Sequence, residues 1–481
     1  MHFLEFCCIF IVQTRSTNSF QKVHKKSLFT RFFMNKHFKT LFSGFIALCC
    51  AMILTLGCSS PSVGSVPVPT LPEGSTIDLS SSSVTADAIV NSMKFGWNLG
   101  NTLDAHEGNE GWSSNKGSVE SDWGMKGTAS QALFNKLYDS GIRTVRIPIS
   151  WHNHVDSSMN IDSGWMNHVK EIVNMAYSKG MFVIINIHHD NYEGSSLGTN
   201  AGFTLNAEDE TKSLAYVEKI WTQISAEFKD YDGHVVFETL NEPRVIGGTH
   251  EWGCDGTPEW GCTTCQQRFA IINALNQKAV DTIRASGGNN ANRLIMFPAY
   301  VAAPYAAIKG KQNGVFTVPS DPNTVNKRLA LSVHMYTPYN FAMNCTAAEG
   351  AHSDFKDSDK TELNNHFTAL KSEFIDKGIP VVIGEMGATN KNNFEARKSW
   401  FSYYLGLCKT YNVAAVLWDN GKETNPDPKE AFGFMDRSTN NWYTDSQAAE
   451  LIAAAVEARG TSGSTPSGSS ENWTSIWTGS T

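Results

Sequence analysis

The sequence of 481 residues predicts a protein of the α/β class that folds as a single (β/α)8 (TIM) barrel. Three observations carry this prediction. Short β-branched runs alternate with stretches of helical period. The alternation repeats eight times over roughly 370 residues, which is within the size range of this barrel. Several of the runs are apolar throughout, as parallel strands buried on both faces are.

The apolar runs predict strands at residues 95–99, 144–149, 182–187, 235–239, 294–297, 330–334, 380–384 and 413–418. The helical period predicts helices at 130–140, 165–179, 212–229, 267–286, 302–308, 362–377, 394–411 and 446–459, of which 302–308 has the weakest pattern. A doubly wound open sheet also alternates strands and helices. Residues 96–101, Gly-Trp-Asn-Leu-Gly-Asn, lack the glycine pattern of its phosphate loop. The barrel is therefore preferred, with bounds at residues 85–459.

The N-terminal segment has the composition of a targeting signal. Lys36 and Lys39 precede an apolar run at 41–56 that ends at Gly57-Cys58. About sixteen apolar-rich residues is short of the ~20 that a membrane span requires. The pattern resembles a bacterial lipoprotein signal with Cys58 as the lipidated residue, except that Thr55 stands where Leu is usual. We expect residues 1–58 to be a signal segment, with Met34 as the preferred start, and the protein to be secreted or lipid-anchored outside the cytoplasm.

Two stretches of low complexity flank the predicted barrel. Residues 59–84 are rich in Ser, Pro and Gly and predict a flexible linker. Residues 460–481 are rich in Gly and Ser and predict a disordered tail. A net charge of -8 argues against a nucleic-acid partner, which requires a basic surface. We expect a monomer whose only contact with a membrane is the lipid anchor.

Five cysteines follow the N-terminal segment: Cys254, Cys262, Cys265, Cys345 and Cys408. The first three lie in a loop that repeats the phrase Glu-Trp-Gly-Cys, at 251–254 and 259–262. A zinc site requires four ligands, and only His250 is close enough in sequence to be the fourth. An extracytoplasmic disulfide inside this loop is favoured, and its pairing stays open.

Polar side chains gather where the predicted strands end, which is where a barrel collects its catalytic groups. They are Arg146 on the second strand, His188, His189 and Asp190 after the third, Asn241 and Glu242 after the fourth, His334 and Tyr336 on the sixth, Glu385 on the seventh, and Trp418, Asp419 and Asn420 on the eighth. Glu242 and Glu385 would face each other across the barrel mouth. Cleavage of a glycosidic bond requires such a pair, one carboxyl to protonate the leaving oxygen and one to attack the sugar. Glu238 is a weaker catalytic candidate, and we expect it to be a carboxylate inside the barrel.

Four motifs in order resemble glycoside hydrolase family 5, the cellulase family: Arg-Ile-Pro at 146–148, Asn-Glu-Pro at 241–243, His-Met-Tyr at 334–336 and Gly-Glu-Met-Gly at 384–387. Residues 96–105 resemble its endoglucanase and xyloglucanase branch, and the resemblance covers about residues 89–455. It implies retaining, endo-acting hydrolysis of β-1,4-glucosidic bonds in cellulose or a related β-glucan, with no cofactor and no metal. Glu242 would be the acid/base and Glu385 the nucleophile.

The resemblance also assigns the remaining site residues. Those that would orient the two glutamates are Arg146, His188, Asn241, His334 and Tyr336. Those that would contact the sugar are Trp418, His189, Asn98 and Trp123. One departure concerns Trp123-Gly124, which is followed by Met125-Lys126 where family members often have Asn-Pro.

Several alternatives stay open. A xyloglucanase, lichenase or mannanase would use the same catalytic core. A non-catalytic sugar-binding barrel would keep Trp418 but lose a carboxylate, and both carboxylates are present. A metal hydrolase is disfavoured because adjacent histidines on a strand, such as His188 and His189, point to opposite faces.

Overall fold

The computed structural model describes residues 66–106, 120, 123–125, 127–193, 196–254, 260–323, 325–424 and 431–460. The predicted signal segment with Cys58 lies outside these residues, as does the predicted tail beyond Gly460. Among the helices in the described ranges, none combines the length and apolar character needed to cross a membrane.

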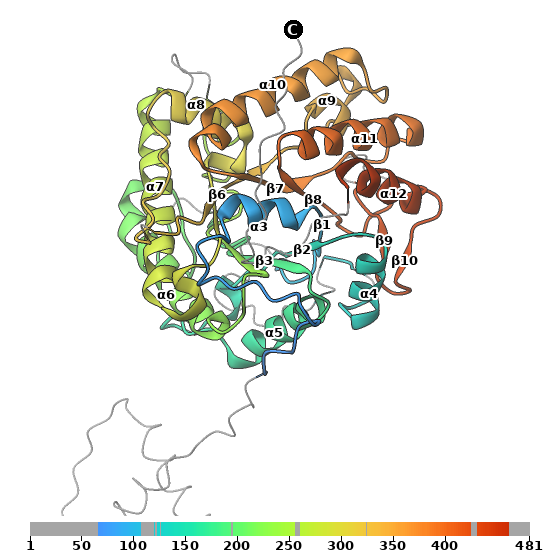
Figure 1. Ribbon diagram of the computed structural model, residues 1–481. Helices are drawn as coiled ribbons and strands as arrows, with labels where there is room; N and C mark the ends of the chain where they lie inside the picture. Colours follow the sequence, from blue (N-terminus) through green and yellow to red (C-terminus); the bar gives the residue numbers. More distant parts are fainter. Residues whose placement is uncertain are drawn as a thin grey trace, which may run out of the picture. The chain divides into compact units, whose positions relative to one another are not determined.

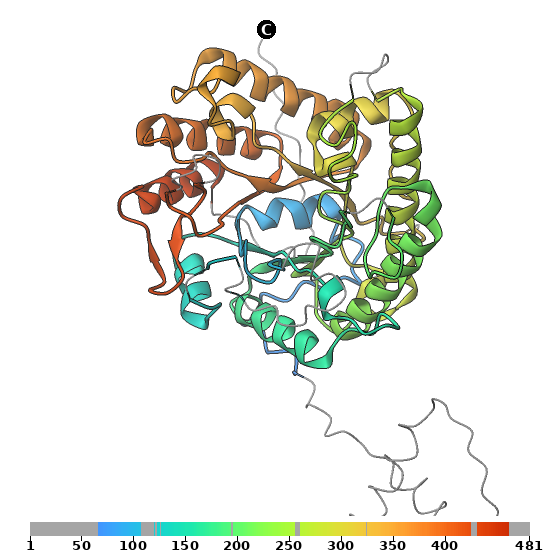
Figure 2. The same ribbon diagram turned by 180° about the vertical axis from the view of Figure 1, so that it is seen from behind.

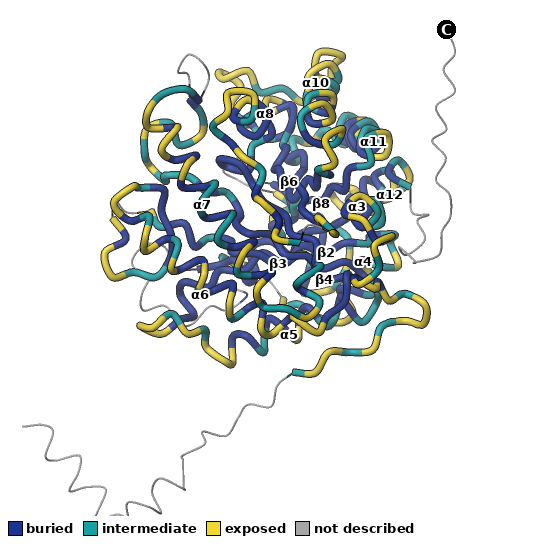
Figure 3. Tube along the Cα trace, turned by 60° about the vertical axis from the view of Figure 1, so that its left-hand side comes forward, coloured by how far each residue is buried: buried dark blue, intermediate teal, exposed yellow. Residues whose placement is uncertain are grey.

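Eight parallel strands close into a barrel in chain order, which confirms the predicted fold (Figure 1). Each strand lies within a few residues of its predicted position, and the ring closes where Gly96 on the first strand pairs with Val416 on the eighth. The strands are β1 (Phe95–Asn98), β2 (Thr144–Ile147), β3 (Phe182–Asn186), β4 (Val235–Glu238), β5 (Ile295–Pro298), β6 (Leu329–His334), β7 (Val381–Met386) and β8 (Ala414–Leu417). All of their residues are buried, and the strands form the dark centre of Figure 3.

Helices ring the barrel and return the chain to the start of each next strand (Figures 1 and 2). They are α4 (Gln131–Asp139), α5 (Ser163–Tyr177), α6 (Glu210–Phe228), α7 (Thr263–Ala285), α8 (Pro304–Gln312), α10 (Asp357–Glu373), α11 (Phe394–Thr410) and α12 (Ala448–Arg459). Side-chain caps define where several begin: the Ser130 hydroxyl accepts the N–H of Leu133 before α4, and the Asp162 carboxylate accepts that of Trp165 before α5.

Shorter elements lie in the connections, and the sequence patterns did not predict them. They are α3 (Ala86–Met93), α9 (Tyr339–Ala342), β9 (Met435–Asp436), β10 (Asn441–Trp442) and the 3-10 turns η2 (His152–His154), η3 (Ala207–Asp209), η4 (Gly288–Ala291), η5 (Tyr300–Ala302), η6 (Ala347–Glu349) and η7 (Ile375–Lys377). Among the described cysteines no two are joined by a disulfide.

The inside of the barrel changes from apolar to polar along its axis. At the end where the strands begin, Phe182, Ile184 and Val236 pack with Ile89 and Met93 of α3 in one apolar cluster. Further along, the inward positions are occupied by Asn98, Arg146, Asn186, Glu238 and Ser332, which bond to one another. The apolar half closes the barrel at one end, and the polar half lies under its mouth.

The predicted linker at 59–84 is wrong over its last residues, because part of it belongs to the barrel. Ile77 and Leu79 are buried in the apolar cluster beside α3. Gly233 lies so close that a Cβ there would come within 2.5 Å of Ile77 Cγ2. The buried guanidinium of Arg328 donates to the carbonyls of Leu79, Ser81 and Val84 at 2.6–2.8 Å. The Ser-rich composition predicted a linker, although Ile77 and Leu79 within it cover the base of the barrel.

Ile77→Ala is expected to lower the free energy of unfolding by about 2–3 kcal/mol, because it opens a cavity against Gly233 and Leu79. Urea denaturation followed by tryptophan fluorescence measures this difference. Val68→Ala, at an exposed position of the same segment, is the matched control and should leave the midpoint unchanged. An unchanged midpoint for Ile77→Ala would show that the segment does not contribute to stability.

Candidate active site

Arg146 is the centre of the polar network under the barrel mouth. Its guanidinium is buried and donates to four acceptors: Glu238 Oε2 at 2.8 Å, Glu385 Oε1 at 2.9 Å, Asn98 Oδ1 at 3.0 Å and Asn241 Oδ1 at 2.7 Å. Glu238 is fully buried and also accepts from Ser332 and Asn186, so it is the internal carboxylate that the sequence indicated. Buried charge of this kind is stable only when it is paired and hydrogen-bonded, and both conditions hold here.

Glu385 reaches the interior through an irregularity in β7. Ile383 and Met386 both pack in the outer apolar cluster, and the register to β8 shifts between them. This interrupts the alternation of the strand and turns the Glu385 side chain into the barrel. Its Oε1 accepts from Arg146 and its Oε2 accepts from the Tyr336 hydroxyl at 2.8 Å. A side chain at Gly384 would be tightly packed, because a Cβ would lie 3.2 Å from both Glu238 Oε1 and His334 Nε2.

Tyr336 stays a proton donor to this carboxylate. Burial raises the pKa of its phenol well above the ordinary range, and the charge of Glu385 adds to the effect. Glu385 therefore accepts two hydrogen bonds, one from a cation and one from a neutral hydroxyl. These two bonds fix the orientation of the carboxyl group in the barrel.

Glu242 follows β4 and lies on the other side of the mouth. Its Oε1 is 2.8 Å from His334 Nδ1, and its Oε2 is 3.5 Å from Arg244 Nη1. One oxygen of Glu242 and one of Glu385 lie within 4.8 Å of each other, with His334 between them. The side chain of Glu242 is 21% exposed and that of Glu385 is 7% exposed, so Glu242 is the carboxyl that solvent reaches more easily.

His334 and Glu242 compete for one proton. Burial pushes the pKa of Glu242 upward, but the hydrogen bond and charge of His334, with Arg244 and Arg146 nearby, outweigh it and leave that pKa lowered. Burial opposes the charge of His334, but the carboxylates of Glu385 and Glu242 outweigh it and raise its pKa. These shifts move the two pKa values apart, so the 2.8 Å contact is an ion pair between protonated His334 and the Glu242 carboxylate.

Aromatic rings line the rim of the mouth. The rings of His188 and Trp418 are parallel within 2° with centroids 6.2 Å apart. Burial lowers the pKa of His188 well below its usual value, so it is neutral. Asn186 Nδ2 lies 3.0 Å from His188 Nδ1, which makes Nδ1 the acceptor and leaves the proton on Nε2. Trp418 is only partly buried, as a ring that receives a ligand must be.

His189, His106 and Trp123 form a second aromatic group beside His188. The Trp123 ring lies 5.3 Å from the rings of both His189 and His106, and its Nε1 donates to the His106 carbonyl at 2.7 Å. His189 Nε2 is 3.9 Å from Asp104, whose pKa burial raises to about 6. The predicted contacts His188, His189, Trp123 and Trp418 therefore border one mouth.

A sequence model of the cellulase family, glycosyl hydrolase family 5, matches residues 103–424, which is more than half of the chain. The chain belongs to this family. Endoglucanase A of Ruminococcus albus is 38% identical over 386 residues, which cover 78% of this chain and 96% of that protein. Endoglucanase A of Clostridium longisporum is 37% identical over 74% of this chain, and the match spans 63% of that longer relative.

Solved family 5 structures share the fold. A broad-specificity endoglucanase from Ruminococcus champanellensis with bound cellotriose is 35% identical, with a TM-score of 0.67, over 78% of this chain and 98% of that one. A lichenase from Caldicellulosiruptor sp. F32 is 33% identical, with a TM-score of 0.70, over 82% of this chain and 99% of that one. The barrel is thus a glycoside hydrolase domain of the endoglucanase type.

Two expectations for this family 5 site are wrong. Asn98 was expected to contact the sugar, but it is fully buried beneath the mouth, where its amide donates to the Gly384 carbonyl at 2.9 Å and accepts from Arg146. His188 and His189 were expected to face apart. Ligand atoms of both lie within 4.8 Å of Asp104, because β3 ends at Asn186 and strand alternation no longer applies beyond it.

Arg244 and Arg437 act in this site, and the sequence analysis did not find them. Arg244 directly follows the Asn-Glu-Pro motif at 241–243, and this position could have identified it as a site residue. Arg437 comes from the connection between β9 and β10 and donates to the carbonyls of Gly100 and Asp419 at 2.7 Å. It fixes the end of β8 next to Trp418. No sequence pattern predicts the contact of Arg437 with Gly100, which is far away in the sequence.

Proposed function

We propose that this family 5 domain is a retaining endo-β-1,4-glucanase in which Glu242 is the acid/base and Glu385 the nucleophile. The observation that carries the proposal is the approach of their carboxylate oxygens to within 4.8 Å. Retaining glycosidases have carboxyl groups about 5–5.5 Å apart, whereas inverting enzymes require about 6.5–9.5 Å to admit a water molecule. Glu385, held by Arg146 and Tyr336, is the less exposed member of the pair.

The first step forms a covalent intermediate. A Glu385 oxygen attacks the anomeric carbon, the glycosidic C–O bond breaks, and Glu242 gives its proton to the leaving oxygen. In the second step Glu242 takes a proton from water, the water oxygen attacks the same carbon, and the ester bond to Glu385 breaks. The sugar leaves with its original configuration, and both glutamates return to their starting states.

The neighbours of the pair let Glu242 change role between the steps. Substrate that covers Glu242 removes the water that still reaches its side chain, and desolvation favours the protonated acid. Esterification then removes the negative charge of Glu385. Loss of a like charge makes Glu242 easier to ionise, which suits a base. His334, in contact with both carboxylates, holds them in place through both steps.

Arg146, His188, Asn241, His334 and Tyr336 position the reacting groups, and Trp418, His189 and Trp123 bind the sugar. The amide oxygen of Asn241 faces Arg146, which turns its NH2 group away to donate to a sugar hydroxyl. Trp418 offers a flat ring for the C–H face of a pyranose. The parallel rings of Trp418 and His188 support this assignment of the rim.

Cellulose and related β-glucans are the proposed substrates. The names of the relatives support this choice, since they include endoglucanases, a broad-specificity endoglucanase and a lichenase. Mixed-linkage glucan is the second candidate because of the lichenase. Reducing ends released from carboxymethyl-cellulose, lichenan, xyloglucan and glucomannan test the proposal. A fast fall in viscosity on the first two supports it, and activity on glucomannan alone would overturn it.

His334→Gln is expected to move the alkaline limb of the kcat/KM profile to higher pH. His334 contributes the hydrogen bond and charge that lower the pKa of Glu242, so its loss leaves burial to raise that pKa. The acid form of Glu242 then persists to higher pH. A pH series on a soluble cello-oligosaccharide measures the shift, and His366→Gln, on the outer helix α10, is the control. A limb that moves to lower pH would contradict the assigned roles.

The N-terminal segment directs this domain outside the cytoplasm, where it acts as a monomer. Lys36 and Lys39, the apolar run and Gly57-Cys58 support export, with the lipid on Cys58. The proposed linker follows Cys58, and residues 460–481 are the proposed tail. The mass of the mature N-terminus tests the anchor: a diacylglyceryl group on Cys58 supports it, and an unmodified N-terminus at another residue overturns it.

A further inference from the structure

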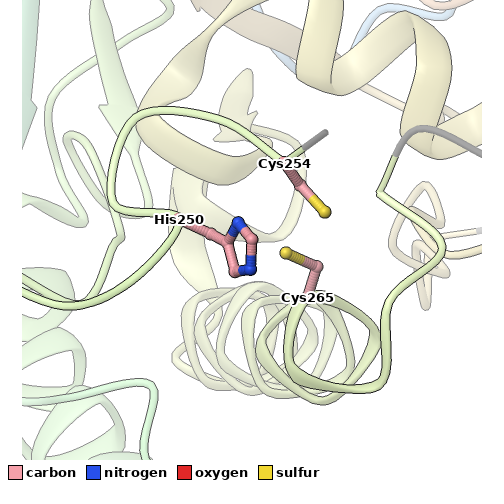
Figure 4. A group of neighbouring side chains, drawn as sticks. All are labelled: His250, Cys254 and Cys265. Carbon is pink, nitrogen blue, oxygen red and sulfur yellow. The ribbon is translucent and has the colours of Figure 1, made fainter. Parts of the chain in front are cut away.

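The loop between β4 and α7 carries a cluster of thiols that the hydrolytic site does not use. His250, Cys254, Cys262 and Cys265 belong to it. Figure 4 shows the thiol of Cys265 pointing toward the ring of His250, with the thiol of Cys254 beside them. One ligand atom from each of these three residues lies within 4.8 Å of the others. Cys262 is outside this group of three, but its Sγ is 3.5 Å from Cys254 Sγ and accepts the N–H of Cys265 at 3.4 Å.

These spacings fit a shared metal ion better than a disulfide. Two sulfurs that bind one tetrahedral zinc at about 2.3 Å lie roughly 3.8 Å apart. Bonded sulfurs lie about 2.05 Å apart. The observed separation of 3.5 Å is close to the first value. A disulfide would also use only two of the three thiols.

Cys262 stands at the start of α7. It is the N-cap of this helix of 23 residues, and its sulfur accepts a backbone N–H of the first turn. Cys262 and Cys265 are separated by two residues, which is a usual spacing for zinc ligands.

The surrounding structure holds His250 and the thiols in place. The Tyr300 hydroxyl donates to the His250 carbonyl at 3.1 Å and accepts from Arg268 at 3.2 Å. Trp260 is fully buried, and its ring packs against Phe269 and Tyr300. Cys265 is fully buried and Cys254 nearly so. His250 and Cys262 are partly exposed, so two of the four proposed ligands are buried and two lie nearer the surface.

We propose that His250, Cys254, Cys262 and Cys265 bind one zinc ion that fixes the loop after β4. Three sulfurs and one imidazole are ligands that zinc prefers, and four protein ligands leave no open position.

The ion would act on the hydrolytic site through two residues of the same loop. Glu251 accepts from Arg244 Nε at 3.1 Å, and the Trp252 ring lies 4.7 Å from the Arg244 guanidinium. Arg244 in turn contacts Glu242. A zinc ion bound beside Glu251 and Trp252 holds Arg244 against that carboxyl. This consequence rests on the proposed role of Glu242, whereas binding of zinc does not.

Metal content and spectroscopy of the full chain test the site. The protein is produced with zinc in the medium and purified without chelator. We expect one zinc per chain, and tetrahedral thiolate-to-metal absorption when Co²⁺ replaces it. Removal of zinc should lower Tm by several degrees and expose three more thiols to a thiol reagent. Cys265→Ser and His250→Ala should lose most of the zinc, while Cys345→Ser, outside the cluster, should keep it.

Two results would overturn the proposal. One is a chain without zinc whose intact mass is lower by two hydrogen atoms, with a peptide that joins Cys254 to another cysteine. The other is a chain whose thiols are all reduced and that takes up neither Zn²⁺ nor Co²⁺ at equimolar concentration. If the Cys265→Ser variant does not fold, the Co²⁺ spectrum of the unaltered chain still shows whether the thiols bind a metal ion. None of these measurements uses substrate, so they are independent of the proposed hydrolysis.

Discussion

Glu385→Gln is expected to lower kcat on cello-oligosaccharides by at least about 10⁴-fold while leaving their affinity within a few-fold. The amide keeps the size of the carboxylate but cannot form the ester with the anomeric carbon. Tyr336 and Arg146 would still surround the side chain, so the site keeps its shape. Initial rates with cellotetraose measure kcat, and calorimetry with the same sugar measures binding.

The control for this variant is Glu218→Gln, which neutralises a half-exposed glutamate paired with Lys278 on the outer helices. It should keep full activity. A covalent test adds the identity of the nucleophile. An activated 2-deoxy-2-fluoro cellobioside should form a stable ester, and peptide mass should place the label on Glu385. Label on any other carboxyl, or turnover by the Glu385→Gln variant, would contradict the assignment of Glu385 as the nucleophile.

The sequence motifs predicted the barrel and the centre of its site because both depend on local patterns. Apolar runs define parallel strands, and polar residues at their ends meet at one edge whatever the loops do. Arg146, Glu242, His334, Tyr336 and Glu385 were predicted in this way, and in the structure they contact one another.

The remaining features depend on contacts between distant parts of the chain. Ile77 lies in a Ser-rich stretch and is buried only because the base of the barrel requires a cover. Asn98 ends a strand, as a sugar-binding residue would, yet Arg146 from the neighbouring strand draws it inward. His188 and His189 approach Asp104 because β3 stops at Asn186, one residue before the predicted end of the strand. The composition of a segment alone does not determine whether its side chains are buried or at which residue a strand ends.

Glu242→Ala is expected to reduce kcat/KM on cello-oligosaccharides by roughly 10³-fold, within the usual range for a lost general acid. The size of the loss should depend on the leaving group. A sugar hydroxyl needs a proton as it departs, whereas dinitrophenolate does not. The rate of ester formation from 2,4-dinitrophenyl cellobioside should therefore change less than about tenfold. His334 would lose one of the two carboxylates that raise its pKa, while Arg146 and Tyr336 would still hold Glu385.

The second half of the reaction separates this role from a merely structural one. Without a base, water attacks the ester slowly, so the intermediate accumulates and KM for the activated substrate falls together with kcat. Azide needs no base and fits the space that the side chain leaves. It should restore turnover and give a β-glycosyl azide, because it attacks the ester from the face that water uses. An α-glycosyl azide would contradict the assignment of Glu242 as the base. An equal loss of rate with both leaving groups would contradict its assignment as the acid. A β product would assign the base to Glu242 and leave the covalent step to Glu385.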